Sequence, residues 1–241
     1  MDCSYAGLTE IPAGLNWKVY SLSLQGNDIP DLGTTTSLGS ETLSGLKILN
    51  LMNNPITSVS STFFNTATGL THLMLHHTEL QTIPVGTFAS LTNLEWLWLN
   101  NNALTSIDRD LFRYNTKLKE LYLQNNALTT VPNGAFVTQT SIKHIYLHEN
   151  DIINPDCCQM CGLPGTVDVK WGYTTQGFAL ECGCSSDSTC TGVYDGVTTT
   201  CHDQSAGECT SYLMNSGHKS TIPLMLTYML MAMVSLLLLF R

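Results

Sequence analysis

The chain has 241 residues, and its 19 acidic side chains against 10 lysines and arginines give a formal net charge of −9. This length allows one elongated domain with appendages, and the composition is that of a folded protein with few charges. The basic residues are scattered singly, so the sequence offers no basic stripe to a nucleic acid or to anionic lipids. Nucleic acid is therefore not expected as a partner.

One residue pattern recurs every 24 residues through the middle of the chain. The first interval is longer, at 27 residues, so three extra residues must be accommodated between Gly33 and Ser44. A fixed period of this length indicates a solenoid, here of six repeats over residues 19–153. The repeats begin at Val19, Leu46, Leu70, Leu94, Leu118 and Ile142.

Each repeat follows the frame LxxLxLxxNxLxxLxxxxF. Its LxL core alternates apolar and variable residues, which predicts a short strand with one buried face. An asparagine at the turn after the strand can satisfy backbone groups of adjacent turns. This column consists of Asn27, Asn54, Asn102, Asn126 and Asn150, with Thr78 as an interruption. Four phenylalanines predict a stacked spine on the convex side, each contributing about 1.5 to 3 kcal/mol by burial: Phe64, Phe88, Phe112 and Phe136.

This frame resembles the typical 24-residue leucine-rich repeat of extracellular receptors, proteoglycan cores, Toll-like ectodomains and the variable lymphocyte receptors of jawless vertebrates. The resemblance implies a curved solenoid of α/β type, with a parallel sheet on its concave face and irregular or short helical segments on its convex side. The stretch CSYAGLTEIP, from Cys3 to Pro12, resembles the end of an N-terminal disulfide cap. We therefore expect residues 1–18 to be the remnant of a cap, and a secretory leader and further cap cysteines to lie upstream of Met1.

Eight of the nine cysteines follow the last repeat, in a segment rich in Gly, Thr and Ser. So high a density in about fifty residues is typical of a disulfide scaffold. The segment stands where such receptors carry a C-terminal cap, so we expect a cysteine-rich cap over residues 154–210. Eight cysteines allow 105 pairings: Cys157, Cys158, Cys161, Cys182, Cys184, Cys190, Cys201 and Cys209. A zinc site on the CxxC and CxC pairs is the alternative, and the oxidised form is favoured because the neighbouring features indicate a protein outside the cell.

The end of the chain is strongly apolar. Residues 222–240 contain no charge and would span roughly 28 Å as a helix, close to the thickness of a bilayer core. Two interpretations remain open: a single-pass helix, or the signal for a glycosylphosphatidylinositol anchor attached at Asn215 or Ser216. Residues 211–221 would then be a short stalk. Either way, the predicted location is the extracellular face of the plasma membrane, and signalling would require an oligomer or a transmembrane co-receptor.

The variable positions of the strands are expected to face outward from the sheet in three columns. The middle column contains Met74, Trp98, Tyr122 and Tyr146, and the first contains His72, Trp96, Glu120 and His144. These residues have the opposite parity to the leucines, so a place in the core does not explain them. Because Trp and Tyr are typical interface anchors, we predict that these eight residues bind a ligand.

Four histidines fall on this face, but a metal site is not expected there. His72 and His76 would lie roughly 13 Å apart along one strand, and His144 and His148 roughly 14 Å further across the sheet. Zinc ligands must converge within about 2.1 Å of the ion. We instead expect the histidines to hydrogen-bond a partner, with binding that changes below about pH 6.5.

Three classes of function remain open. The favoured one is a membrane-tethered recognition or adhesion protein that binds a protein or glycan through the concave face. A second is a structural spacer without a specific ligand. An enzyme is the weakest, because phosphate-binding loops, nucleophile elbows and metalloprotease motifs are missing and only Glu120 and His144 could act as an acid and base. No cofactor is expected.

Overall fold

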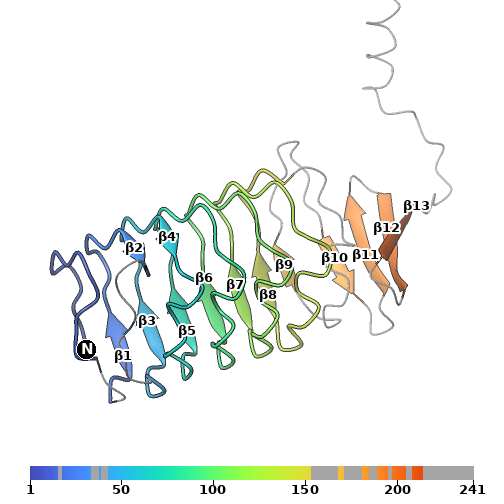
Figure 1. The fold of residues 1–241 in the computed structure, drawn as a ribbon. Helices are drawn as coiled ribbons and strands as arrows, with labels where there is room; N and C mark the ends of the chain where they lie inside the picture. The colour runs from blue at the N-terminus through green and yellow to red at the C-terminus, as the bar shows by residue number, and fades with distance from the viewer. Residues whose placement is uncertain are drawn as a thin grey trace, which may run out of the picture.

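The computed structural model describes residues 1–15, 18–33, 38, 43–152, 168–170, 181–184, 189–194, 197–204 and 208–213. Six short strands arise from the six predicted repeats and lie side by side (Figure 1). They are β1 (Ser21–Ser23), β3 (Ile48–Asn50), β5 (His72–Met74), β6 (Trp96–Trp98), β7 (Glu120–Tyr122) and β8 (His144–Tyr146). The prediction of one strand per repeat is confirmed.

The strands form one parallel sheet in the order β1-β3-β5-β6-β7-β8-β9. The register is constant from repeat to repeat: Leu73 lies opposite Leu97, and Leu97 opposite Leu121. The seventh strand, β9 (Asp168–Lys170), pairs with β8 although it falls in the segment predicted as the cap. That segment therefore extends the sheet of the solenoid by one strand.

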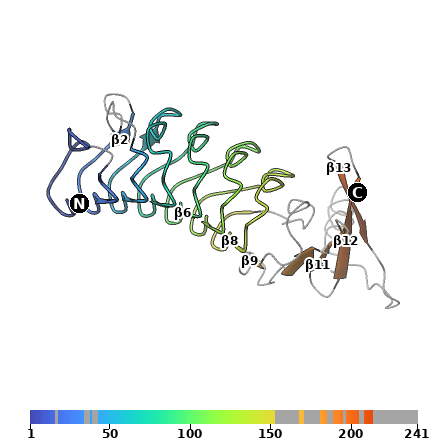
Figure 2. The same cartoon turned by 90° about the horizontal axis from the view of Figure 1, so that it is seen from below.

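Leucines at the predicted positions fill the space inside the coil. In β6 and the residues after it, Leu97, Leu99 and Leu104 are wholly buried. The four predicted spine phenylalanines are also buried, and consecutive rings stack with centroids 6.0 to 6.2 Å apart. This side of the coil is built from turns in the described residues, which agrees with the irregular form of the predicted convex side (Figure 2).

The asparagine column bridges successive turns as predicted. The amide of Asn126 donates to the carbonyls of Leu99 and Leu123, and its Oδ1 accepts from the N–H of Leu104, all within 3.1 Å. Asn54, Asn102 and Asn150 repeat these contacts one coil apart. Each such side chain satisfies three backbone groups that the turn would otherwise bury without partners.

The residue before each column position takes a left-handed backbone conformation. Its φ is +66° at Gly26 and between +52° and +57° at five further positions: Asn53, His77, Asn101, Asn125 and Glu149. Only glycine adopts this region without steric cost, and asparagine tolerates it better than most residues. The frame that predicted the asparagine column does not reveal this second column, because its residue types differ.

The first residues continue the coil. The N–H of Cys3 donates to the carbonyl of Ser23 at 2.8 Å, and Asp2 forms a parallel bridge with Ser23. Tyr5 has the φ of +55° found at later turns, and the amide of Asn27 donates to the carbonyl of Cys3. Residues 1–15 thus cover the first edge of the sheet, with Cys3 as a free thiol packed against the core.

Two smaller sheets complete the described structure. Strands β2 (Asp31–Leu32) and β4 (Ser58–Val59) pair in parallel. Residues 34–37 and 39–42 of the longer first interval lie outside the described residues. An antiparallel sheet follows the solenoid, with the order β10-β11-β12-β13. Its strands are β10 (Glu181–Cys184), β11 (Thr189–Tyr194), β12 (Val197–Gln204) and β13 (Glu208–Leu213).

Several predictions concern residues that the structure does not describe. These are Cys157, Cys158, Cys161, the anchor positions Asn215 and Ser216, and the apolar segment 222–240. Within the described residues, no helix has the length and apolar character needed to cross a bilayer.

Candidate functional site: the outer face of the parallel sheet

The predicted binding residues share one face of the parallel sheet, here called the sheet face. Register pairing places Met74, Trp98, Tyr122 and Tyr146 in line across β5 to β8, and His72, Trp96, Glu120 and His144 in a second line beside them. All eight side chains are half-buried, in contrast to the leucine or isoleucine between each pair on a strand, which is buried. The structure therefore brings all eight predicted residues together.

Trp98, Tyr122 and Tyr146 form a stacked aromatic ladder. The Trp98 and Tyr122 ring centroids are 5.4 Å apart with planes 9° from parallel, and those of Tyr122 and Tyr146 are 4.6 Å apart at 4°. This stacking explains why the rings of the ladder are half-buried although they face outward from the sheet. Rings on neighbouring strands shield one another, and such contacts contribute about 0.5 to 1.5 kcal/mol per pair beyond their buried area.

Trp96 lies beside the ladder and is held from two sides. The imidazole of His72 stacks on it from β5, with centroids 4.2 Å apart. From the β7 side, the ammonium of Lys119 lies 5.0 Å from the centre of the ring and also contacts Glu95 at 2.5 Å. A cation over a tryptophan face is attractive, so Trp96 is fixed by packing and by electrostatics. The repeat pattern does not predict this role for Lys119.

The hydroxyl of Tyr122 donates a hydrogen bond to the carboxylate of Glu120 on the same strand. Burial raises the pKa of Tyr122 well above its ordinary value of 10, and the hydrogen bond and negative charge of Glu120 raise it further. Tyr122 is therefore a neutral donor, and the only carboxylate predicted on this face already has a partner. Glu120 and His144, the two residues that could act as an acid and base, are register partners on β7 and β8.

Two histidines of the face favour the neutral form. Burial lowers the pKa of His72, with a partly opposing effect from Glu95 and a further lowering by Lys119. Burial also lowers the pKa of His76, and the neighbouring His77 adds to the effect. These two histidines should therefore become protonated only at a pH below the ordinary pKa of 6.5, because burial removes water from the charged imidazole.

A row of polar side chains follows the ladder at the ends of the strands. The row contains His76, Asn100 and Gln124, each two residues beyond a position of the middle column. Asn100 is only 8% exposed. One polar atom of each side chain, His76 Nδ1, Asn100 Oδ1 and Gln124 Oε1, is buried without a hydrogen-bond partner. Such atoms cost about 1 to 3 kcal/mol each when unsatisfied, so the polar row is a local cost to the stability of the fold.

Comparison with known proteins agrees with this geometry. Two overlapping segments, residues 44–104 and 92–152, match the family model of the leucine rich repeat. They contain the strands β3 to β8 and the whole aromatic ladder. Residues 44–152 are similar to leucine-rich repeats in sequence and form the parallel-strand solenoid expected of them. A search of curated proteins finds no match to this chain.

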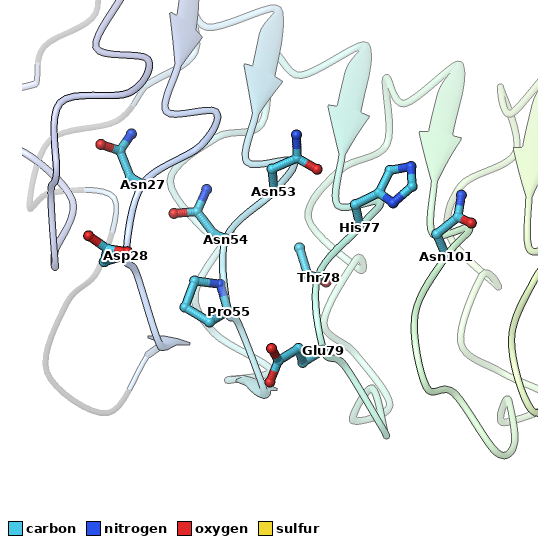
Figure 3. A pocket seen from close by; sticks show the side chains of 9 residues that line it. All are labelled: Asn27, Asp28, Asn53, Asn54, Pro55, His77, Thr78, Glu79 and Asn101. Carbon is cyan, nitrogen blue, oxygen red and sulfur yellow. The ribbon is translucent and has the colours of Figure 1, made fainter.

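A shallow hollow of 530 Å³ lies where the leucine-rich repeats turn away from the sheet (Figure 3). The buried amides of Asn27 and Asn54 in its wall already bind backbone groups. Its exposed side chains include the carboxylates of Asp28 and Glu79. The hollow is lined by Asn27, Asp28, Asn53, Asn54, Pro55, His77, Thr78, Glu79 and Asn101. It is formed by the turns of the leucine-rich repeats, and the predicted binding residues are not part of it.

In the described part of the chain, no group of three or more His, Cys, Asp or Glu side chains could hold a metal ion. Leucine-rich repeat domains generally mediate protein–protein interaction and are typically scaffolds without enzymatic activity. The sheet face has the features of such a scaffold: rigid aromatic anchors, a polar border and support from a packed core.

Proposed function

We propose that the protein is a membrane-tethered recognition or adhesion protein of the cell surface, and that its leucine-rich repeats bind a ligand through the sheet face. The aromatic ladder is the observation that carries this proposal. Its rings lie on the outer face of the sheet, so packing of the core does not explain them. Stacking holds the rings in one arrangement in the unbound protein. Binding through rings already fixed in place loses little conformational entropy.

The extracellular location rests on the cysteines and on the apolar end of the chain. In the antiparallel sheet, Cys190 lies opposite Cys184 on one side and opposite Cys201 on the other. Directly opposite residues of antiparallel strands are about 4.5 to 5.5 Å apart at Cα, which suits a disulfide. We propose that the segment after the repeats is an oxidised cap, and that residues 222–240 provide the tether to the membrane.

Binding is tested with the full chain against an array of extracellular protein domains. We expect at least one domain whose affinity falls tenfold or more in the double variant Trp98→Ala, Tyr122→Ala. Tyr114→Ala is the matched control, because Tyr114 is 56% exposed and lies outside the sheet face. Binding that survives the double variant for every domain would contradict the proposal.

The tether is tested on cells that express the chain behind a secretory leader. Release by a phospholipase specific for phosphatidylinositol would identify a lipid anchor, and retention at the surface would identify a single-pass helix. Deletion of residues 222–240 should release the protein into the medium in both cases. Protein that remains inside the cell despite the leader would contradict the location.

A further inference from the structure

The hollow at the turns lies outside the sheet face and has a size suited to a small ligand (Figure 3). Its volume of 530 Å³ falls within the range of roughly 300 to 1,000 Å³ that is typical of ligand sites. The lining extends over four successive coils, from Asp28 in the first to Asn101 in the fourth. At the spacing of parallel strands these coils span about 14 Å, which is longer than one sugar ring or one amino acid side chain.

The charge of the lining restricts the ligand. The carboxylates of Asp28 and Glu79 are exposed and have no hydrogen-bond or ion-pair partner among the described residues. No lysine or arginine is among the residues that line the hollow, and Pro55 is the apolar residue among them. Two negative charges without a neighbouring cation repel an anionic ligand, and one proline offers little surface to an apolar ligand.

The backbone fixes the position of three further polar side chains. Asn53, His77 and Asn101 belong to the left-handed column, and each donates its N–H to a carbonyl one coil further on at 3.1 to 3.4 Å. Oδ1 of Asn101 accepts a hydrogen bond from the amide of Asn125, so the NH₂ group of Asn101 is left to donate to a ligand. The imidazole of His77 lies against that of His76, with centroids 5.5 Å apart. Groups held in this way lose little entropy when a ligand binds.

Metal ions and amines fit this lining less well than hydroxyl groups do. Asp28 and Glu79 lie two coils apart, about 10 Å at the spacing of parallel strands, whereas calcium binds its oxygen ligands at about 2.3 to 2.6 Å. An ammonium group only donates hydrogen bonds, so it gives the NH₂ group of Asn101 no acceptor. A hydroxyl group both donates to a carboxylate and accepts from an amide, and several hydroxyl groups in a row are characteristic of a sugar.

We propose that the hollow is a second binding site of this chain and that it takes an uncharged oligosaccharide. The carboxylates of Asp28 and Glu79 accept hydrogen bonds from sugar hydroxyl groups, and the amides of Asn53 and Asn101 donate to them. This site is separate from the sheet face and goes beyond the function proposed for that face.

The full chain is tested on an array of neutral, sialylated and sulfated oligosaccharides. The hollow is open to solvent, so we expect weak binding that dense display on the array makes measurable. At least one neutral oligosaccharide should bind, and its affinity should fall tenfold or more in Glu79→Gln and in Asn53→Asp. The matched controls Glu149→Gln and Asn65→Asp change exposed side chains outside the hollow and should bind like the parent chain. Thermal melting verifies that each variant folds, and Asp28→Asn tests a carboxylate on a different coil.

Asn53→Asp also separates a sugar from a cation, because it replaces a hydrogen-bond donor with a third carboxylate. Binding of spermine that strengthens in Asn53→Asp, without a neutral oligosaccharide that depends on Glu79, would assign the hollow to a cationic ligand and overturn the proposal. A preference for sialylated or sulfated oligosaccharides would overturn it as well, and so would equal binding by Glu79→Gln, Asp28→Asn and the parent chain.

Trp98→Ala distinguishes this site from the sheet face. Oligosaccharide binding that is unchanged in Trp98→Ala and lost in Glu79→Gln supports a separate site in the hollow. Binding that falls in Trp98→Ala and stays unchanged in Glu79→Gln belongs to the sheet face, and it would overturn this inference while the proposed function stands.

Discussion

The hydroxyl of Tyr122 is bound to the carboxylate of Glu120, two residues earlier on the same strand. In the folded protein the pKa of Tyr122 is raised by burial first and by Glu120 second, whereas an unfolded tyrosine titrates near 10. The folded state thus retains its proton at a pH where the unfolded state loses it. The contribution of Tyr122 to the free energy of unfolding is fully present below pH 10 and is lost as the pH rises above 10.

Alkaline unfolding monitored by circular dichroism tests this pair. We expect Tyr122→Phe to lose less stability than the parent chain between pH 9 and 11, because it has no phenol to ionise. Glu120→Gln should lower the pKa of Tyr122, visible as earlier phenolate absorbance. Tyr114→Phe is the control at an exposed site, and an identical alkaline profile for Tyr122→Phe and the parent chain would refute the effect.

His72 and His76 should make the folded protein sensitive to mild acid. Burial lowers the pKa of both, so below the ordinary value of 6.5 the unfolded state binds more protons than the folded state. The contribution of these two histidines to the free energy of unfolding is therefore fully present above pH 6.5, and it falls as the pH drops below 6.5. Melting temperatures measured from pH 7.5 to 5 should decline less steeply in the double variant His72→Gln, His76→Gln. A variant with the parent slope would show that these side chains do not carry the effect.

Replacement of Thr78 by asparagine should stabilise the solenoid. The Thr78 hydroxyl contacts the carbonyl of Leu75 and Oδ1 of Asn102, and the N–H of Ile56 binds the carbonyl of Asn54 instead of a column side chain. An asparagine could restore the usual contacts. We expect Thr78→Asn to raise the free energy of unfolding by about 1 kcal/mol in urea denaturation. Thr78→Val, which has no polar group, should lower it, and the reverse order would contradict the argument.

Glu149 occupies the left-handed turn before Asn150 with a φ of +55°. Its side chain is exposed, so substitution there changes chiefly the backbone energy. Relief of the steric cost in Glu149→Gly should outweigh the added entropy of the unfolded chain. We expect this variant to be more stable than Glu149→Ala by about 0.5 to 1 kcal/mol. Equal urea midpoints for the two variants would show that the turn is not strained.

Lys119 should control the position of Trp96. Removal of the ammonium in Lys119→Met keeps the aliphatic stem but ends both the contact with the ring and the ion pair with Glu95. We expect Trp96 to become more accessible, with indole fluorescence more readily quenched by acrylamide. Lys143→Met is the matched control on an exposed lysine of the next repeat. Unchanged quenching in Lys119→Met would show that the contact with the ammonium does not hold Trp96 in position.

The sequence by itself determined the architecture of the repeats. The alternation around Leu97 and Leu99 and the 24-residue period specify which side chains are buried, and burial of leucine is the dominant local driving force. The same period placed the asparagine column, the phenylalanine spine and the eight residues of the sheet face correctly. Each of these features depends on a residue type that recurs at one position.

Only the tertiary structure decided how the outward side chains are arranged. The covering of Trp96 by Lys119, the closed faces of the aromatic ladder and the unpartnered amide of Asn100 depend on rotamers and on neighbours one coil away. The pairing of β9 with β8 is likewise not predicted by the sequence, because the segment that contains β9 lacks the repeat frame. A periodic pattern records which positions are buried, because burial selects apolar residues. It does not record how polar and aromatic side chains meet across strands, since many residue types satisfy the same outward position.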